Sequence, residues 1–177
     1  MSDEPRKRRG GPIFTLWKNP GMQSGQVEAI YVGATQGEVP LPVERARAVA
    51  GRGLEGDRYF NGGGTFSEPR KDGQDVTLIE AEALEGLAGE AGIELPPGAS
   101  RRNVVTRGLA LNDLVGKRFT VGEVECVGRR LCDPCSHLER LTEPGVLKGL
   151  AGRGGLRADI LNDGWISVGA PLTELPG

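Results

Sequence analysis

Cysteine and histidine are scarce in this sequence of 177 residues, which contains three cysteines and one histidine. The cysteines, Cys126, Cys132 and Cys135, all fall within ten residues. An odd number at this spacing does not suit a framework of disulfides. In a reducing compartment, cysteines serve chemistry or metal binding instead. We therefore predict a cytoplasmic protein in which at least one of these thiols is functional.

The sequence also lacks long apolar stretches and a strong excess of charge of either sign. No apolar run approaches the roughly eighteen residues needed to cross a bilayer. Lysine and arginine number 22 against 24 acidic residues, which gives a formal net charge of −2. This near balance creates no overall field that would favour nucleic acid or an anionic membrane. We therefore predict no membrane span and no nucleic-acid partner.

Glycine and proline, by contrast, are abundant, with 29 and 12 residues spread among short apolar runs. Such spacing favours a fold with many turns and short strands. Residues 1–24 combine turn residues with the basic run Arg6–Arg9 and are predicted to form a flexible basic tail. Residues 25–177 show no internal repeat and have the length of one domain.

Alternating apolar residues predict about seven short strands. These strands are expected over residues 25–32, 75–79, 103–106, 117–121, 123–127, 156–161 and 165–168. The last two flank a tight turn at residues 162–164 and are predicted to form a β-hairpin. Apolar spacing of three and four predicts a helix over residues 80–91 that ends at Gly92. A second helical region, residues 139–150, is predicted to break at Pro144-Gly145.

This set of elements predicts a mainly β fold of the α+β class. A closed or half-closed β-barrel with peripheral helices is the simplest architecture that hides the edges of so many strands.

The densest group of reactive side chains lies in residues 130–137, where Cys132, Cys135 and His137 occur in a turn between a strand and a helix. The thiolate is the reactive form of cysteine. A helix that begins after Cys135 would stabilise that anion, as would three nearby arginines: Arg129, Arg130 and Arg140. Three functions remain open: a nucleophilic or persulfide-carrying thiolate, a ligand for a soft metal such as zinc, copper or molybdenum, and a CxxC redox pair.

Free cysteines also occur as small buried apolar residues. This interpretation is favoured for Cys126, which lies in an alternating strand, whereas Asp133-Pro134 predicts a turn for the segment that carries the other two. A structural zinc site is not favoured, because it needs four ligands and one histidine plus a CxxC pair leaves the set short. His137 is expected to be a hydrogen-bond partner of a functional group, a surface residue or a ligand.

Arginines recur in well-separated turn segments: Arg58, Arg101, Arg102, Arg153 and Arg157. The planar guanidinium group binds phosphate and carboxylate, but such residues are equally often surface salt-bridge partners. Glycines beside Arg58 and Arg153 permit loops whose N–H groups could line an anion site. If these arginines converge near Cys135, the ligand is anionic and is predicted to be phosphorylated.

The order of these motifs resembles the MOSC family, named after the C-terminal domain of molybdenum cofactor sulfurase. The resemblance covers about residues 25–172 and rests on GLEGDRY, DVTLIE, RRNVVT, LVGKRFTVG and LCDPCSHLE in that order. It implies a MOSC-type β-barrel with peripheral helices and a functional cysteine towards the C-terminus. Cys135 matches that cysteine best, because it stands before Ser136-His137-Leu138, and Cys132 is the second candidate.

The resemblance also implies functions. In cofactor-binding relatives the cysteine ligates molybdenum, and in sulfur-handling relatives it carries a persulfide. We therefore expect either a molybdenum-pterin cofactor with Cys135 as the metal ligand, or sulfur carriage with a cysteine desulfurase-type sulfur donor. Asn103 matches an asparagine beside the cofactor site, and Arg101 and Arg102 match partners of the pterin phosphate.

Relatives of this family also include molybdenum-dependent reductases of N-hydroxylated compounds. Those reductases usually carry an electron-delivery module or a longer cofactor segment, which we do not find in this sequence. The pyridoxal phosphate module of the full sulfurase is not found either. A binding or regulatory module without catalytic activity is the remaining alternative.

Overall fold

The computed structural model describes residues 24–63 and 69–177. The predicted tail therefore lies outside the described residues, except for Ser24, which begins the first strand. Within the described residues, seven strands form a closed barrel, because the last strand pairs with the first. In order around the barrel they are β1 (Ser24–Val32), β6 (Val104–Arg107), β5 (Val76–Glu80), β9 (Leu156–Ile160), β8 (Val124–Leu131), β7 (Arg118–Val121) and β11 (Pro171–Glu174). The predicted barrel is thus confirmed.

Two smaller groups of strands extend the barrel. β2 (Leu41–Val43) pairs with the far part of β1, opposite Ile30 to Val32. β3 (Arg45–Val49), β4 (Gly53–Leu54) and β10 (Gly164–Ser167) form a separate antiparallel sheet in which β3 is central. β2, β3, β4 and β11 were not among the seven predicted strands, so the sequence pattern did not reveal the strand that closes the barrel.

The predicted hairpin around residues 162–164 is wrong. β9 pairs with β5 and β8, whereas β10 pairs with β3. The turn between them bonds to the β7–β8 connection instead: the Asn162 amide donates to the Glu123 carbonyl at 3.2 Å and accepts from the Glu125 N–H at 2.6 Å. The two strands therefore separate at Asn162 and enter different sheets.

Helices cover one side of the barrel: α1 (Ala81–Ala91), α2 (Ser136–Leu141) and α3 (Val146–Gly149). α1 is the crossover between the parallel strands β5 and β6. It ends as predicted at Gly92, which has φ +68° and donates its N–H to the Ala88 carbonyl, while the next residue, Ile93, donates its N–H to the Leu87 carbonyl. The predicted break separates α2 from α3, and there the Glu139 carboxylate accepts the N–H groups of Gly145 and Leu147. Among the described residues no helix has the length and apolar character of a membrane span.

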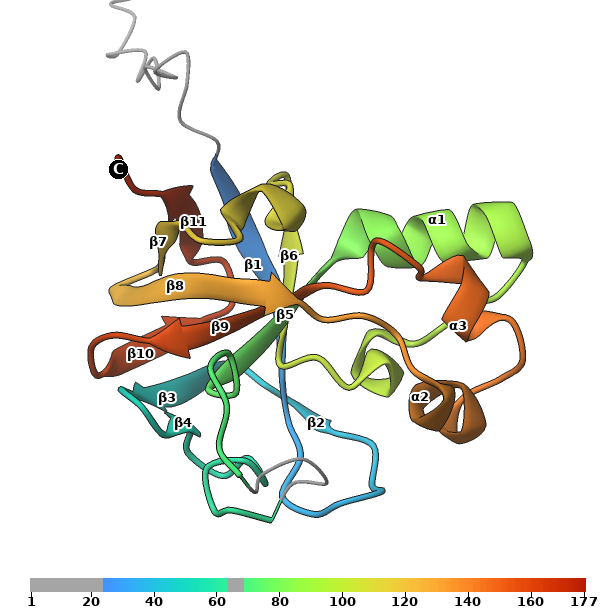
Figure 1. Ribbon diagram of the computed structural model, residues 1–177, viewed down its shortest axis with the longest axis horizontal. Helices are drawn as coiled ribbons and strands as arrows, with labels where there is room; N and C mark the ends of the chain where they lie inside the picture. Colours follow the sequence, from blue (N-terminus) through green and yellow to red (C-terminus); the bar gives the residue numbers. More distant parts are fainter. Residues whose placement is uncertain (1–23, 64–68) are drawn as a thin grey trace, which may run out of the picture.

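Two hydrophobic cores share the strands β5 and β6. Leu78 and Val104 point into the barrel interior, while the next residues, Ile79 and Val105, point outward under the helices. Figure 1 shows this division, with the barrel strands on the left and the three helices grouped on the right. Because both faces of β5 and β6 are buried, these two strands are held firmly in place. Three segments are attached to this rigid frame: the segment that follows β4, the segment before β6 and the segment before α2.

Candidate functional site

Seven of the nine predicted site residues border a single pocket. They are Arg58, Arg101, Arg102, Asn103, Cys135, His137 and Arg157. Its volume is about 70 Å³, well below the roughly 300–1,000 Å³ of a site that encloses a drug-sized ligand. Four further residues complete the lining: Tyr59, Thr77, Asp133 and Leu138. The pocket therefore has room for a small group, such as one phosphate, while the rest of a larger ligand would lie outside.

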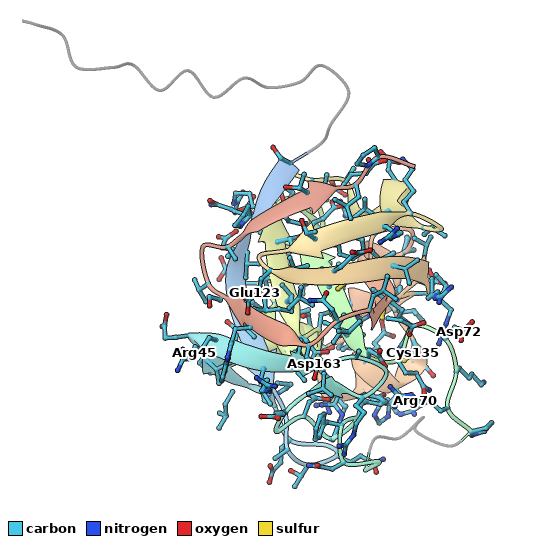
Figure 2. All side chains as sticks on the ribbon, turned by 90° about the vertical axis from the view of Figure 1, so that its left-hand side faces the viewer. Arg45, Arg70, Asp72, Glu123, Cys135 and Asp163 are labelled. Atoms are coloured by element: carbon cyan, nitrogen blue, oxygen red, sulfur yellow. The ribbon has the colours of Figure 1, made fainter. Side chains whose placement is uncertain are left out.

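Cys135 lies at the mouth of this pocket as the residue that precedes α2. Its side chain is exposed, and in Figure 2 it lies below the barrel strands, on the side of the molecule away from Arg45. Cys132 differs sharply: it is 1% exposed and is not among the lining residues. Of the two candidate cysteines, only Cys135 can meet a ligand in the pocket without a rearrangement of the chain.

The pocket is rich in positive charge. Arg58 and Arg102 are only 6% and 7% exposed, and Asp133 is the one acidic side chain among the lining residues. Within the described part of the chain, none of the four lining arginines forms an ion pair with a carboxylate. Burial, followed by repulsion from Arg58, lowers the pKa of the Arg101 guanidinium. These charges are therefore crowded together without the paired carboxylates that surface arginines usually find, although the charge of the nearby Asp57 carboxylate favours the Arg101 cation.

A buried network supports the floor of the pocket. The Asn103 amide donates to the Tyr31 carbonyl and to Asp57 Oδ2, and its Oδ1 accepts the N–H and the hydroxyl of Thr77. An asparagine side chain has two N–H donors and one oxygen with two lone pairs. All of these groups are engaged inside the protein, so the contacts of Asn103 are those of a structural support and leave no donor for a ligand.

Asp57, the other centre of this network, was not identified from the sequence. It is 3% exposed, and its carboxylate also accepts the N–H groups of Gly33 and Tyr59. The sequence signal was present, since an aspartate before Arg58 in a glycine-rich loop suggests a turn held by a carboxylate. Tyr59 and Thr77 carried no comparable signal.

Several arginines expected at the site lie elsewhere. Arg153 is paired with Glu90 of α1, with Nη2···Oε2 at 2.7 Å, and borders a different groove. Arg129, expected beside the thiols, is paired with Asp159, with Nε···Oδ2 at 2.7 Å. Arg130 donates to the Asp72 carbonyl, and neither it nor Arg140 borders the pocket. The positive charge near Cys135 comes from residues distant in sequence rather than from its neighbours in the chain.

The third cysteine, Cys126, is a buried apolar residue, as its place in an alternating strand predicts. Cys126 is fully buried among the apolar residues of the barrel interior. Burial, followed by the charge of Asp75, strongly raises the pKa of its thiol, so that it stays protonated and unreactive. Within residues 24–63 and 69–177, no group of three or more histidine, cysteine, aspartate or glutamate side chains is placed to hold a metal ion.

Comparison with known proteins gives one family and several related folds. A family model described as MOSC domain matches residues 63–173. The YuaD protein from Bacillus subtilis has a TM-score of 0.73 at 16% identity, over 86% of this chain and 96% of that chain. YiiM from Geobacillus stearothermophilus has a TM-score of 0.65 at 21% identity, over 86% of this chain and 75% of that chain. YiiM from Escherichia coli has a TM-score of 0.64 at 20% identity, over 87% of this chain and 70% of that chain. No protein of curated function matches the sequence.

Proposed function

Because this chain belongs to the MOSC domain family, we propose that its arginine-lined pocket binds the anionic part of a molybdenum-pterin cofactor and that Cys135 is the protein ligand of the metal. The observation that carries the proposal is the presence of two buried guanidinium groups, Arg58 and Arg102, in a pocket that opens beside an exposed thiol.

Electrostatics supports an anionic ligand. A buried charge that is not paired with an ion of opposite sign is costly, and the cost falls when such an ion binds beside it. Arg101 and Arg157 add two further positive charges to the same pocket. Guanidinium groups also match the geometry of phosphate oxygens. A phosphate in this pocket would offset the repulsion that Arg58 exerts on Arg101.

The chemistry of the available donors also fits such a cofactor. A bare metal ion needs several protein ligands, and the described residues offer no such cluster. A metal that arrives within an organic ligand needs only one further soft donor, which Cys135 can supply as a thiolate. When bound, the cofactor would supply two-electron redox chemistry at molybdenum. The protein would contribute the thiolate of Cys135, the phosphate contacts of Arg58, Arg101 and Arg157, and a rigid floor built on Asp57 and Asn103.

The cofactor proposal is tested by purification of the protein from a molybdenum-replete host, followed by metal analysis and pterin fluorescence. Wild type should carry both signals, and Cys135→Ser should lose molybdenum. Arg58→Gln should lose the pterin signal, whereas Arg153→Gln, at a residue that borders a different groove, should retain it. Absence of molybdenum and pterin from wild type would refute the proposal.

The exposure of Cys135 supports sulfur carriage as a second candidate function. In that case the Cys135 thiolate would attack the outer sulfur of a donor persulfide, form the new S–S bond and release the donor thiolate, with no external oxidant. The donor would be a cysteine desulfurase-type protein, which requires that the accepting sulfur be accessible. Persulfide labelling after incubation with such a donor should be strong in wild type and Cys132→Ala, and lost in Cys135→Ala. Equal labelling of wild type and Cys135→Ala would exclude this function.

A further inference from the structure

We propose that Arg102 is a positioning residue, which holds the segment that carries Cys135 at a fixed place beside the other arginines. Its neighbour Arg101 is expected to face the ligand instead. This inference rests on the proposed role of Cys135, but its test needs no cofactor. The sequence presents the two arginines as an equivalent pair, and the structure separates them.

The guanidinium group of Arg102 is committed to three backbone carbonyls. Nε donates to Gly154 at 2.9 Å, Nη1 to Ser100 at 3.1 Å and Nη2 to Cys132 at 3.0 Å. These three acceptors belong to the turn before β6, the loop before β9 and the segment before α2. One side chain therefore joins three parts of the chain that meet at the pocket, as only a planar fork with five donors can.

The segment before Cys135 is also held by Gly154 and Gly155. The Cys132 N–H donates to the Gly155 carbonyl at 2.7 Å. Gly154 packs so closely that an added Cβ would lie 2.5 Å from the Cys132 carbonyl oxygen and 2.8 Å from Pro134 Cδ. Proline restricts its own backbone and that of the residue before it. The backbone from Cys132 to Pro134 is thus fixed, and it sets where the Cys135 side chain begins.

Arg101 has a different environment. It adopts a left-handed backbone with φ +62°, the only positive φ of a residue other than glycine among those described. Its side chain is half-buried, and its one side-chain hydrogen bond to the described residues joins Nη1 to the Glu38 carbonyl at 2.7 Å. Of five N–H donors on the group, most are therefore available to a ligand. Arg101 has the same charge as Arg102 without its structural contacts, which makes it a matched control.

The test compares how fast Cys135 reacts with iodoacetate and with neutral iodoacetamide, measured by mass spectrometry on the isolated protein. The rate ratio reports how far the sulfur lies within the field of the arginines, because only iodoacetate is attracted by them. Arg102→Lys keeps the charge but cannot bond all three carbonyls. It should lower the ratio by about threefold or more, because the summed Coulomb attraction of the arginines falls as the sulfur moves away from them. Arg101→Lys should keep the ratio within about twofold of wild type.

Gly154→Ala provides an independent displacement of the same segment without any change of charge, and it should lower the ratio as Arg102→Lys does. Gly89→Ala, where an added Cβ meets nothing within 4 Å, should leave the ratio unchanged. If Arg102→Lys does not fold, Gly154→Ala decides. Wild-type ratios in the folded variants would overturn the inference. A lowered ratio in a protein that carries neither molybdenum nor pterin would support the positioning role and refute only the cofactor proposal.

Discussion

The Asp57 carboxylate accepts a hydrogen bond from the side-chain amide of Asn103, with Oδ2···Nδ2 at 3.1 Å, and both side chains are buried. This bond links the turn after β4 to the residue that precedes β6. Because Asn103 also binds Thr77 at the start of β5, the floor of the pocket is assembled by the folded protein itself. A preorganised floor lowers the cost of binding, since no groups need to be ordered by the ligand.

Replacement of this amide by a carboxylate should damage the fold in a pH-dependent way. Asn103→Asp is close in shape, but at pH 7 it removes two donors and places a second negative charge beside Asp57. We expect a loss of about 3 kcal/mol or more in the free energy of unfolding. Like charges raise the pKa of such a pair, so one carboxyl group binds a proton as the pH falls. The loss measured by urea denaturation should therefore be smaller at pH 5 than at pH 7.

Asn61→Asp is the control for this comparison, because Asn61 is exposed. Its effect should stay within about 0.5 kcal/mol at both pH values. A pH-independent loss in Asn103→Asp would show that the two carboxylates do not meet.

The sequence predicts those site residues whose side-chain type alone indicates their chemistry. Cys135 and the arginines Arg58, Arg101 and Arg157 were identified because thiols and guanidinium groups in turns are distinctive. The supporting residues were not, since the burial of Asp57 and Thr77 and most of their partners come from other elements of the fold. The distinction between Arg101 and Arg102 could not be predicted either, because it depends on which carbonyls lie within reach.

The fold, too, could be predicted from the sequence only in part. Alternation predicted most barrel strands because each has one face in the barrel interior. The pairing of β9 and β10 was predicted wrongly, since the turn signal at Asn162 describes only the local bend of the chain. The partners of the two strands are distant in sequence, and the Asn162 side chain bonds across to Glu123 and Glu125. Strand β11 was missed because only one of its four residues is fully buried.

Asp75 should weaken the fold as it ionises. Burial raises the pKa of its carboxyl group above the ordinary value of 3.8, although the Ile160 N–H and the Arg70 guanidinium oppose this shift. A carboxyl group that is less acidic in the folded state makes folding less favourable once the pH exceeds its pKa in both states. Asp75→Asn cannot ionise, so its stability relative to wild type should rise as the pH increases from about 4 to 7.

Urea denaturation at several pH values measures this difference. Asp72→Asn, at an exposed position of the same loop, is the matched control and should follow the wild-type pH dependence. A constant difference between Asp75→Asn and wild type across this range would contradict the predicted cost of ionisation.

Two of the three thiols, Cys135 and Cys126, should react in a defined order. Exposed Cys135 should react with iodoacetamide in the native protein, whereas Cys126 should react only when the barrel opens, because its thiol is buried and its pKa is raised. Addition of urea should therefore accelerate labelling of Cys126 in proportion to the unfolded fraction. Peptide mapping after timed alkylation identifies each site. Labelling of Cys126 as fast as Cys135 in native buffer would contradict its place in the barrel interior.

The barrel should also depend on a glycine at the start of β9. Gly155 has φ +111°, and an added Cβ would lie 2.0 Å from the Leu78 carbonyl oxygen of β5. Gly155→Ala therefore combines a clash with an unfavourable backbone, and we expect a loss of about 3 kcal/mol or more in the free energy of unfolding. Gly128→Ala separates the two causes, because its φ is not in the left-handed region but its Cβ would lie 2.1 Å from the Leu114 carbonyl oxygen. Gly89→Ala, in an open position of α1, should instead stabilise by about 0.5–1 kcal/mol. Denaturation of the three variants in urea gives the comparison, and a Gly155→Ala protein as stable as wild type would show that β9 and β5 do not approach each other as closely as described.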